Sequence, residues 1–175
     1  PPPRTRRRPP VVSTARKHRS GTCGYRTSDR GRFDSGANSG IPYQFYNYTL
    51  TEENVYVYNR YSQLYKIISR ANTLFAHLGD VSYATPSARD TYEAEARFLR
   101  ALSYYWLVTE WGDVPLVLKV LESTEEVRAN NYRRPKAEIY QAIFDDLKYV
   151  TESPLLDVQP ASACGKVSKA AAWAL

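Results

Sequence analysis

The stretch "EAEARFLRALSYYWLVTEWGDVPLV" at residues 93–117 decides the fold of this chain. Its apolar residues recur at three- and four-residue spacing, as they do on an α-helix, and they form two stripes rather than one. The first stripe is Tyr92, Ala96, Leu99, Leu102 and Trp106, and the second is Ala94, Phe98, Ala101, Tyr105 and Val108. Because each stripe needs a neighbour to cover it, the pattern predicts a helix over about 86–111 that packs between two others.

The residues Gly112-Asp113-Val114-Pro115 mark the end of this helix. Glycine adopts the left-handed conformation that ends many helices, and aspartate bonds neighbouring backbone amides in turns. A residue that precedes proline is pushed into extended geometry. We therefore predict that "VPLVLKVL", residues 114–121, leaves the helix as an extended apolar strand or sheet edge.

A second helix is predicted upstream, over about 52–78, where apolar residues again recur mostly at three and four. Thr49 and Thr51 offer N-caps for it, and Glu52 stands three residues after Thr49 as a capping-box partner. Residues 21–50 have the composition of loops, with short irregular strands expected around 43–48.

Two further helices are predicted downstream. One covers about 135–151 and starts at Pro135, and the other begins within "KVSKAAAWAL", residues 166–175. The four helices predict two hairpins, 52–111 and 135–175, and hence a mainly α fold of tetratricopeptide-like antiparallel helix pairs with irregular N-terminal loops. The last helix carries no stop signal, so we expect an incomplete domain.

The positive charge of the chain is concentrated at its N-terminus. Residues 1–40 contain ten Lys and Arg and two Asp, whereas the remainder contains fourteen basic and sixteen acidic residues. We expect 1–24 to be a disordered basic arm and 25–175 to form the helical domain. No aromatic residue interleaves the arginines of the arm, which disfavours nucleic acid as a partner. The spacing leaves open whether Cys23 and Cys164 pair.

The charged residues of the helices indicate structure rather than catalysis. Arg97 follows Glu93 by four residues, a spacing that favours an ion pair along one helix, and Arg100 can reach Asp145 or Asp146 on the third helix. Glu110 and Asp113 are two carboxylates, but turn chemistry explains Asp113 without an acid/base role. His77 has no partner at ligand spacing. No nucleotide, metal or catalytic motif is present, so neither an enzyme nor a cofactor is expected.

Several segments together resemble the SusD/RagB family of outer-membrane nutrient-uptake lipoproteins of Bacteroidota. They are "YSQLYKIISRANTL" at 61–74, the opening stretch, "RRPKAEIYQAIFDDLKYV" at 133–150 and "GKVSKAAAWAL" at 165–175. The most specific positions are Glu95, Ala96, Arg97, Phe98, Leu99, Arg100, Ala101, Gly112, Asp113 and Pro115. The resemblance covers roughly 41–175 and identifies these positions as structural.

This resemblance implies a glycan- or nutrient-binding protein rather than an enzyme. It implies a position at the cell surface, where the protein covers a TonB-dependent outer-membrane transporter and hands ligand to it. Family members are lipid-anchored through an N-terminal cysteine and are much longer than this chain. The residues before Cys23 do not form such an acylation signal, and the chain corresponds to an N-terminal part of the family.

Sugar recognition needs flat aromatic faces and planar polar groups. The candidates are in the predicted N-terminal loops: Tyr43, Phe45, Tyr46, Tyr48 and Asn47. The alternative for each is packing of the loops onto the helices. For the whole chain, the alternative function is a helical-repeat adaptor that binds a protein partner.

Overall fold

The computed structural model describes residues 43–46, 48–163 and 165–175 of the chain. Three long helices dominate this part, namely α2 (Val55–His77), α3 (Pro86–Trp111) and α5 (Lys136–Glu152). The shorter elements are α1 (Tyr43–Tyr46), α4 (Thr124–Asn130), the 3-10 turn η1 (Ala161–Ala163) and α6 (Lys169–Ala174). The predicted basic arm at 1–24, Asn47 and both cysteines lie outside the described residues.

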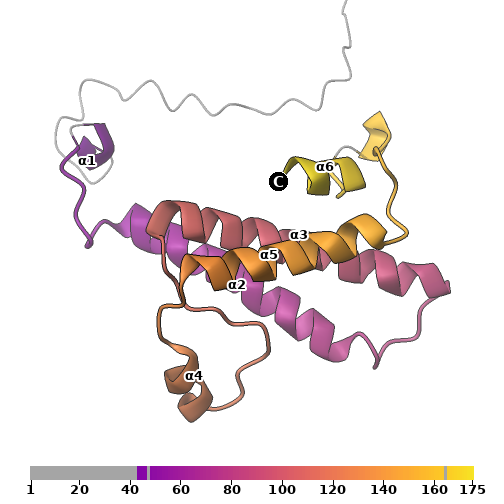
Figure 1. The fold of residues 1–175 in the computed structure, drawn as a ribbon, viewed down its shortest axis with the longest axis horizontal. Helices are drawn as coiled ribbons and strands as arrows, with labels where there is room; N and C mark the ends of the chain where they lie inside the picture. The colour runs from indigo at the N-terminus through magenta and orange to yellow at the C-terminus, as the bar shows by residue number, and fades with distance from the viewer. Residues whose placement is uncertain (1–42, 47, 164) are drawn as a thin grey trace, which may run out of the picture.

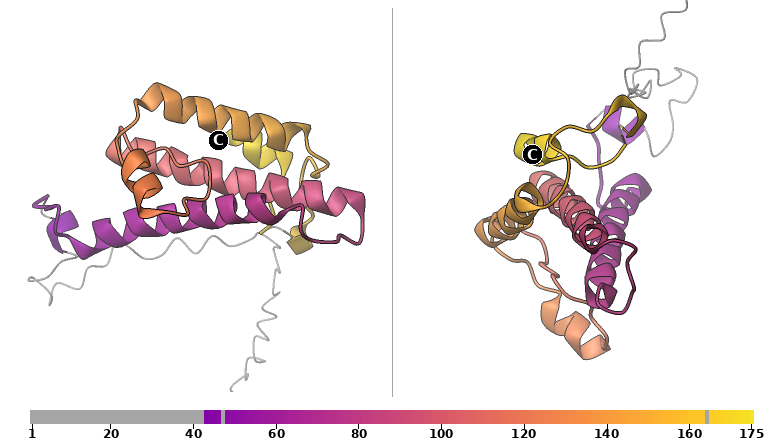
Figure 2. Two further views of the ribbon diagram at one scale, coloured as in Figure 1. Left: turned by 90° about the horizontal axis from the view of Figure 1, so that it is seen from below. Right: turned by 90° about the vertical axis from the view of Figure 1, so that its right-hand side faces the viewer.

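Helix α3 is the middle element of the fold. It packs against α2 on one side and α5 on the other, and α6 packs against α5. Figures 1 and 2 show α3 between its two neighbours, with each running antiparallel to it. The core contains Ile68 from α2, Ala101 and Leu107 from α3, and Ile139 and Val150 from α5. The predicted mainly α fold of antiparallel helix pairs is confirmed, and α3 has the predicted bounds.

Only one of the two predicted stripes on α3 faces the core. Ala94, Ala101 and Val108 of the second stripe are buried. In the first stripe Ala96 is buried, but Leu99 is 45% exposed and Trp106 is 41% exposed, so the prediction that a neighbour covers the whole first stripe is wrong. Outside the two stripes, the buried positions of the helix are Glu93, Arg100, Ser103, Tyr104 and Leu107. Polar side chains therefore occupy inward positions that a count of apolar residues assigns to the surface.

Because Trp106 is partly exposed, we expect the loss of its side chain to lower stability only modestly. Its ring contacts the Arg60 guanidinium, whose central carbon lies 5.2 Å from the ring centroid. An exposed cation–π contact of this kind contributes about 0.5–1 kcal/mol. We expect Trp106→Ala to lower the free energy of unfolding by about 1 kcal/mol, measured by urea denaturation. A loss above about 3 kcal/mol, typical of a buried tryptophan, would contradict this placement.

The N-terminus of α2 is capped by Asn54, and the predicted caps Thr49 and Thr51 are wrong. The Asn54 Oδ1 atom accepts hydrogen bonds from the backbone N–H of Tyr56 and Val57, at 2.9 and 3.4 Å. The backbone N–H of Asn54 donates to the carbonyl of Thr51 at 3.1 Å, so the residues between them form a turn before the helix begins.

The segment before this turn is a helical turn rather than the predicted strand. Helix α1 lies beyond the N-terminal end of α2 (Figure 1). The buried Asn54 side chain ties the two together, because its Nδ2 atom donates to Gln44 Oε1 at 2.8 Å. One asparagine therefore both starts α2 and fixes α1 beside it.

Helix α4 was not predicted, although the sequence contains its signal. Ser123 is the N-cap, and its hydroxyl oxygen accepts a hydrogen bond from the backbone N–H of Glu126 at 3.1 Å. The Glu126 carboxylate accepts in turn from the backbone N–H of Glu122 at 3.0 Å. This is the reciprocal arrangement of a capping box, displaced by one residue. The helix projects away from the three-helix layer (Figures 1 and 2).

The end of α3 positions the start of α5. Gly112 has a φ of 79°, and its N–H donates to the Val108 carbonyl at 3.1 Å. Turn chemistry predicted that the Asp113 carboxylate bonds to neighbouring backbone amides, and this is wrong. The carboxylate instead accepts a hydrogen bond from the backbone N–H of Lys136 at 3.1 Å. Pro135, the N-cap of α5, forms no side-chain cap hydrogen bond. Asp113 therefore supplies the cap of α5 from a distant part of the chain.

The predicted strand at 114–121 does not form, apart from one isolated β-bridge. Val114 forms an isolated antiparallel bridge with Arg134, whose N–H donates to the Val114 carbonyl at 3.0 Å. The carbonyls that follow accept hydrogen bonds from side chains of α2 and α3 instead of from a neighbouring strand. These side chains satisfy the backbone without a sheet.

Gly112 is a position where a side chain would be strained. A Cβ atom there would lie 3.2 Å from Lys136 Cε, and the positive φ strains any other residue. We expect Gly112→Ala to lower the free energy of unfolding by about 1–3 kcal/mol. The matched control is Gly79→Ala, because a Cβ at Gly79 meets nothing within 4 Å. Equal urea midpoints for the two variants would show that the backbone at Gly112 is unstrained.

Candidate functional site

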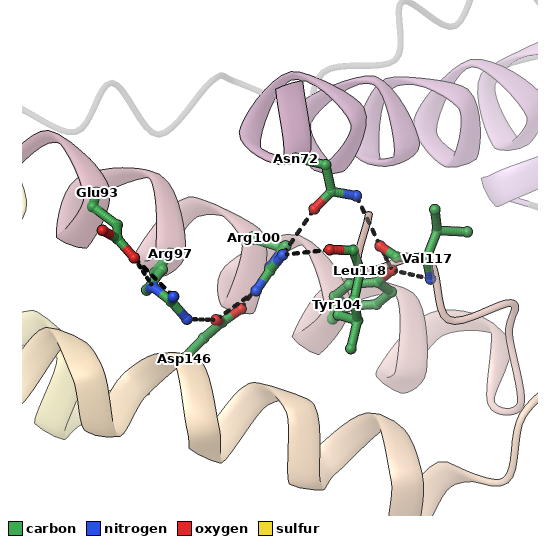
Figure 3. A network of polar contacts seen from close by, with 8 residues as sticks. All are labelled: Asn72, Glu93, Arg97, Arg100, Tyr104, Val117, Leu118 and Asp146. Carbon is green, nitrogen blue, oxygen red and sulfur yellow. Dashed lines mark hydrogen bonds and ion pairs between the residues drawn. The ribbon is translucent and has the colours of Figure 1, made fainter. Parts of the chain in front are cut away.

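A buried polar network joins the three long helices (Figure 3). Its centre is the Asp146 carboxylate on α5, which is 2% exposed. Arg100 of α3 donates to it twice, from Nε and Nη2, at 2.7 Å each. Arg97 Nη1 donates to the same carboxylate at 3.1 Å. The predicted pairing of Arg100 with the third helix is confirmed, with Asp146 rather than Asp145 as the partner.

The second half of the network holds the segment after α3 in place. Arg100 Nη1 donates to Asn72 Oδ1 on α2 at 2.8 Å, and Asn72 Nδ2 donates to the Val117 carbonyl at 3.0 Å. The Tyr104 hydroxyl donates to the Val117 carbonyl at 2.9 Å and accepts from the Val117 N–H at 2.8 Å. Burial, the largest effect, raises the pKa of Tyr104 to about 12, so this hydroxyl stays neutral at physiological pH.

Arg97 is fully occupied by contacts within the protein. Its Nε and Nη2 atoms donate to Glu93 Oε1 at 2.9 and 2.8 Å, as predicted from their spacing. Its guanidinium also lies 4.3 Å from the Tyr149 ring centroid. Burial lowers the pKa of Arg97, but the hydrogen bond to Glu93 and the charges of Asp146 and Glu93 outweigh it and raise the pKa overall. The guanidinium is therefore held charged.

The network has the chemistry of a scaffold rather than of a ligand site. Two arginines face two carboxylates, Glu93 and Asp146, so the charges balance. No buried side-chain nitrogen or oxygen in the described residues lacks a hydrogen-bond partner. A charge-balanced cluster without an unsatisfied buried atom holds no buried group that needs a ligand as its partner. It fixes the relative positions of α2, α3 and α5 instead.

Exposed aromatic side chains gather near the start of α2. Tyr48 is 94% exposed and has a φ of 58°, uncommon for a bulky residue, and such positions cluster at functional sites. Phe45 and Tyr56 are half-exposed, and their rings meet edge to face with centroids 6.4 Å apart. Tyr43 and Tyr46 belong to α1, but the structure describes neither of their side chains.

A solvent-open hollow of about 390 Å³ lies where α2 begins and α3 ends. Its apolar lining comes from Leu50, Val57, Tyr58, Tyr61 and Trp111. Thr51 and Glu52 supply the polar part of the lining. The volume falls in the range of about 300–1,000 Å³ typical of small-molecule sites.

Ring contacts hold the aromatic wall of the hollow together. The Tyr61 ring lies edge-on to Trp111 at 5.3 Å between centroids and tilted against Tyr65 at 4.8 Å. The Tyr65 hydroxyl donates to the Pro115 carbonyl at 2.7 Å, and burial is the main cause of its raised pKa. Tyr58, in contrast, is 68% exposed at the hollow. A fixed wall beside an accessible ring suits a flat apolar ligand face.

Sequence reasoning missed the hollow because its residues are far apart in the chain. Tyr58 and Tyr61 belong to a helix that was interpreted as scaffold, and Trp111 ends another. Only the antiparallel pairing of α2 and α3 brings the end of one helix beside the start of the other. No local signal marked Tyr58, which stands three residues before Tyr61 and seven before Tyr65, the spacing of one helix face.

Neither a metal site nor a membrane-spanning helix is found in the part of the chain that the structure describes. No group of three or more His, Cys, Asp or Glu side chains there is placed to hold a metal ion. Of the helices described, none combines the length and the apolar character needed to cross a bilayer. His77 lies on the helix surface, as expected, where its Nδ1 atom is 2.9 Å from the Asp80 carboxylate.

Comparison with known proteins identifies the family. A sequence model for SusD-like proteins, described as starch-binding and associating with the outer membrane, matches residues 16–175. The chain belongs to the SusD-like family. A SusD-like protein from Formosa agariphila is 31% identical over 135 residues, which is 77% of this chain and 26% of the relative.

Solved structures of SusD-like proteins share the fold. A SusD superfamily protein from Parabacteroides distasonis has 28% identity and a TM-score of 0.64, over 75% of this chain and 27% of that one. A laminarin-binding SusD-like protein has 32% identity and a TM-score of 0.59, over 65% of this chain and 24% of that one. The chain thus spans about a quarter of the length of these relatives.

Proposed function

We propose that this chain is part of a cell-surface protein that binds a carbohydrate and delivers it to a TonB-dependent transporter of the outer membrane. The observation that carries the proposal is the match to the SusD-like family over residues 16–175. The laminarin-binding protein among its relatives supports carbohydrate as the ligand class. The role is binding rather than catalysis, and the full-length protein is lipid-anchored and faces outward.

The aromatic residues near the start of α2 support a carbohydrate face. Tyr48, Phe45 and Tyr56 are exposed on this side, together with the hollow that contains Tyr58. Sugar rings present C–H groups that stack on aromatic faces, and their hydroxyls bond to nearby polar groups. The predicted ligand residues Tyr43, Phe45, Tyr46, Tyr48 and Asn47 remain part of this proposal.

The carbohydrate proposal is tested by titrating the chain with soluble starch and laminarin in a calorimeter. We expect saturable binding of at least one of them. The variant Tyr58→Ala should weaken it about tenfold, since loss of an aromatic stacking contact costs on the order of 1–2 kcal/mol. The matched control is Tyr92→Ala, an exposed tyrosine in a second hollow at the opposite end of α2. Absence of binding to starch, to laminarin and to an oligogalacturonate would overturn the carbohydrate proposal.

The transporter partner has a separate test. Outer membranes that contain the full-length protein are solubilised, and the protein is isolated through an affinity tag. We expect a TonB-dependent transporter to accompany it in constant proportion. A stable complex with a different protein, combined with no glycan binding, would favour the helical-repeat adaptor instead.

A further inference from the structure

We propose that the hollow between the start of α2 and the end of α3 is a subsite for uncharged glycans, and that Glu52 excludes anionic ones. This inference rests on the proposed function and names its substrate class. Sugar polymers divide into neutral chains and chains that carry uronate or sulfate groups. The charge of a binding hollow decides which of these can enter it.

The lining of the hollow carries negative charge without a positive partner. Glu52 is the charged residue of the hollow, and no lysine or arginine from the described residues lines it. Glu52 is exposed and forms no ion pair with any described residue. An unpaired carboxylate repels a second carboxylate or a sulfate brought close to it.

Two basic side chains from the same ends of the helices do not line the hollow. Arg60 of α2 forms an ion pair with Glu110 at 3.1 Å and contacts the Trp106 ring. The side chain of Lys136 lies against Gly112 and does not line the hollow. Neither cation forms an ion pair with Glu52 or lines the hollow.

The same carboxylate favours a neutral sugar. An ionised carboxylate accepts short, charge-assisted hydrogen bonds from hydroxyl groups, which every neutral sugar offers. Thr51 adds a hydroxyl, and the wall of Tyr61 and Trp111 offers an apolar face beside these polar atoms. A sugar ring has this combination of an apolar face and a hydroxylated edge.

The backbone turn that contains Glu52 is held in position. Asn54 closes the turn that begins at Thr51, through its backbone N–H at 3.1 Å, and its buried side chain caps α2. The Cα atom of Glu52 is therefore fixed relative to the aromatic wall. The Glu52 carboxylate therefore stays within the length of one side chain of the hollow.

The test compares two oligosaccharides of matched length, a neutral laminarin oligosaccharide and an oligogalacturonate, on the intact chain. We expect the neutral ligand to bind more tightly to the unaltered protein. Glu52→Gln should raise the affinity for the oligogalacturonate relative to the neutral ligand about fivefold, equivalent to about 1 kcal/mol for a solvent-exposed charge pair. The effect should diminish in high salt.

The matched control is Glu53→Gln, which removes the same charge from an adjacent exposed residue that does not line the hollow. We expect it to leave the affinity ratio unchanged. Equal ratios for all three proteins, or tighter binding of the oligogalacturonate by the unaltered protein, would overturn the inference while carbohydrate binding stands. Failure to bind either ligand or starch would overturn the proposed function as well.

Discussion

Asp146→Asn is expected to lower the free energy of unfolding by about 3–5 kcal/mol, because it leaves two arginines without their shared buried carboxylate. Asp146 accepts three hydrogen bonds from Arg97 and Arg100. Asparagine keeps the size of the side chain but removes its charge and turns one acceptor into a donor. Urea denaturation followed by circular dichroism measures the loss.

The neighbouring carboxylate provides the control for this prediction. Asp145 is exposed and accepts one hydrogen bond, from Gln141 at 2.9 Å. Asp145→Asn should change stability by no more than about 0.5 kcal/mol, as is usual at the surface. If Asp146→Asn cost less than about 1 kcal/mol, the network would not be the element that fixes α5 against α3.

Leu107→Ala is expected to lower the free energy of unfolding by about 2–5 kcal/mol, the range for a leucine truncated in a packed core. Leu107 is 0% exposed in the middle helix. Leu99→Ala makes the same chemical change on the same helix at a position that is 45% exposed. We expect its cost to stay below about 1 kcal/mol. A larger loss for Leu99 than for Leu107, measured by thermal or urea unfolding, would place the wrong face of α3 against the core.

The sequence predicted the long helices well because their signals are local. Thr85-Pro86 and Gly112 set the bounds of α3 through propensities that act over a few residues. The predicted caps of α2, Thr49 and Thr51, were wrong because several residues that can cap a helix stand close together before it, and the structure uses Asn54. The turn that decides between them depends on contacts with α1.

The inward face of α3 was harder to predict because it buries charge. Arg100 occupies a core position only because Asp146 and Asn72 meet it there from two other helices. The cost of burying a charge is offset by partners that periodicity cannot reveal. Leu99 and Trp106 were assigned to the core instead, since apolar residues are the ones that a hydrophobic pattern selects.

The candidate site was predictable only in part for a related reason. The exposure of Phe45 and Tyr48 agrees with their expected place outside the core. Glu52 and Trp111 meet in one hollow through the pairing of two helices, and this juxtaposition has no signature in the sequence. Residues on opposite ends of a helical hairpin become neighbours only once the hairpin forms.

In the proposed function, ligand binding and scaffold are separate: the ligand binds at the start of α2, and the polar network holds the three long helices together. Hydrogen–deuterium exchange of the chain, with and without saturating laminarin, tests it most directly. We expect ligand-dependent protection in peptides that cover 48–61 and the end of α3 around Trp111. Peptides that cover Arg97, Val117 and Asp146 should exchange equally in both states. Protection confined to the network peptides, with none at 48–61, would contradict the account.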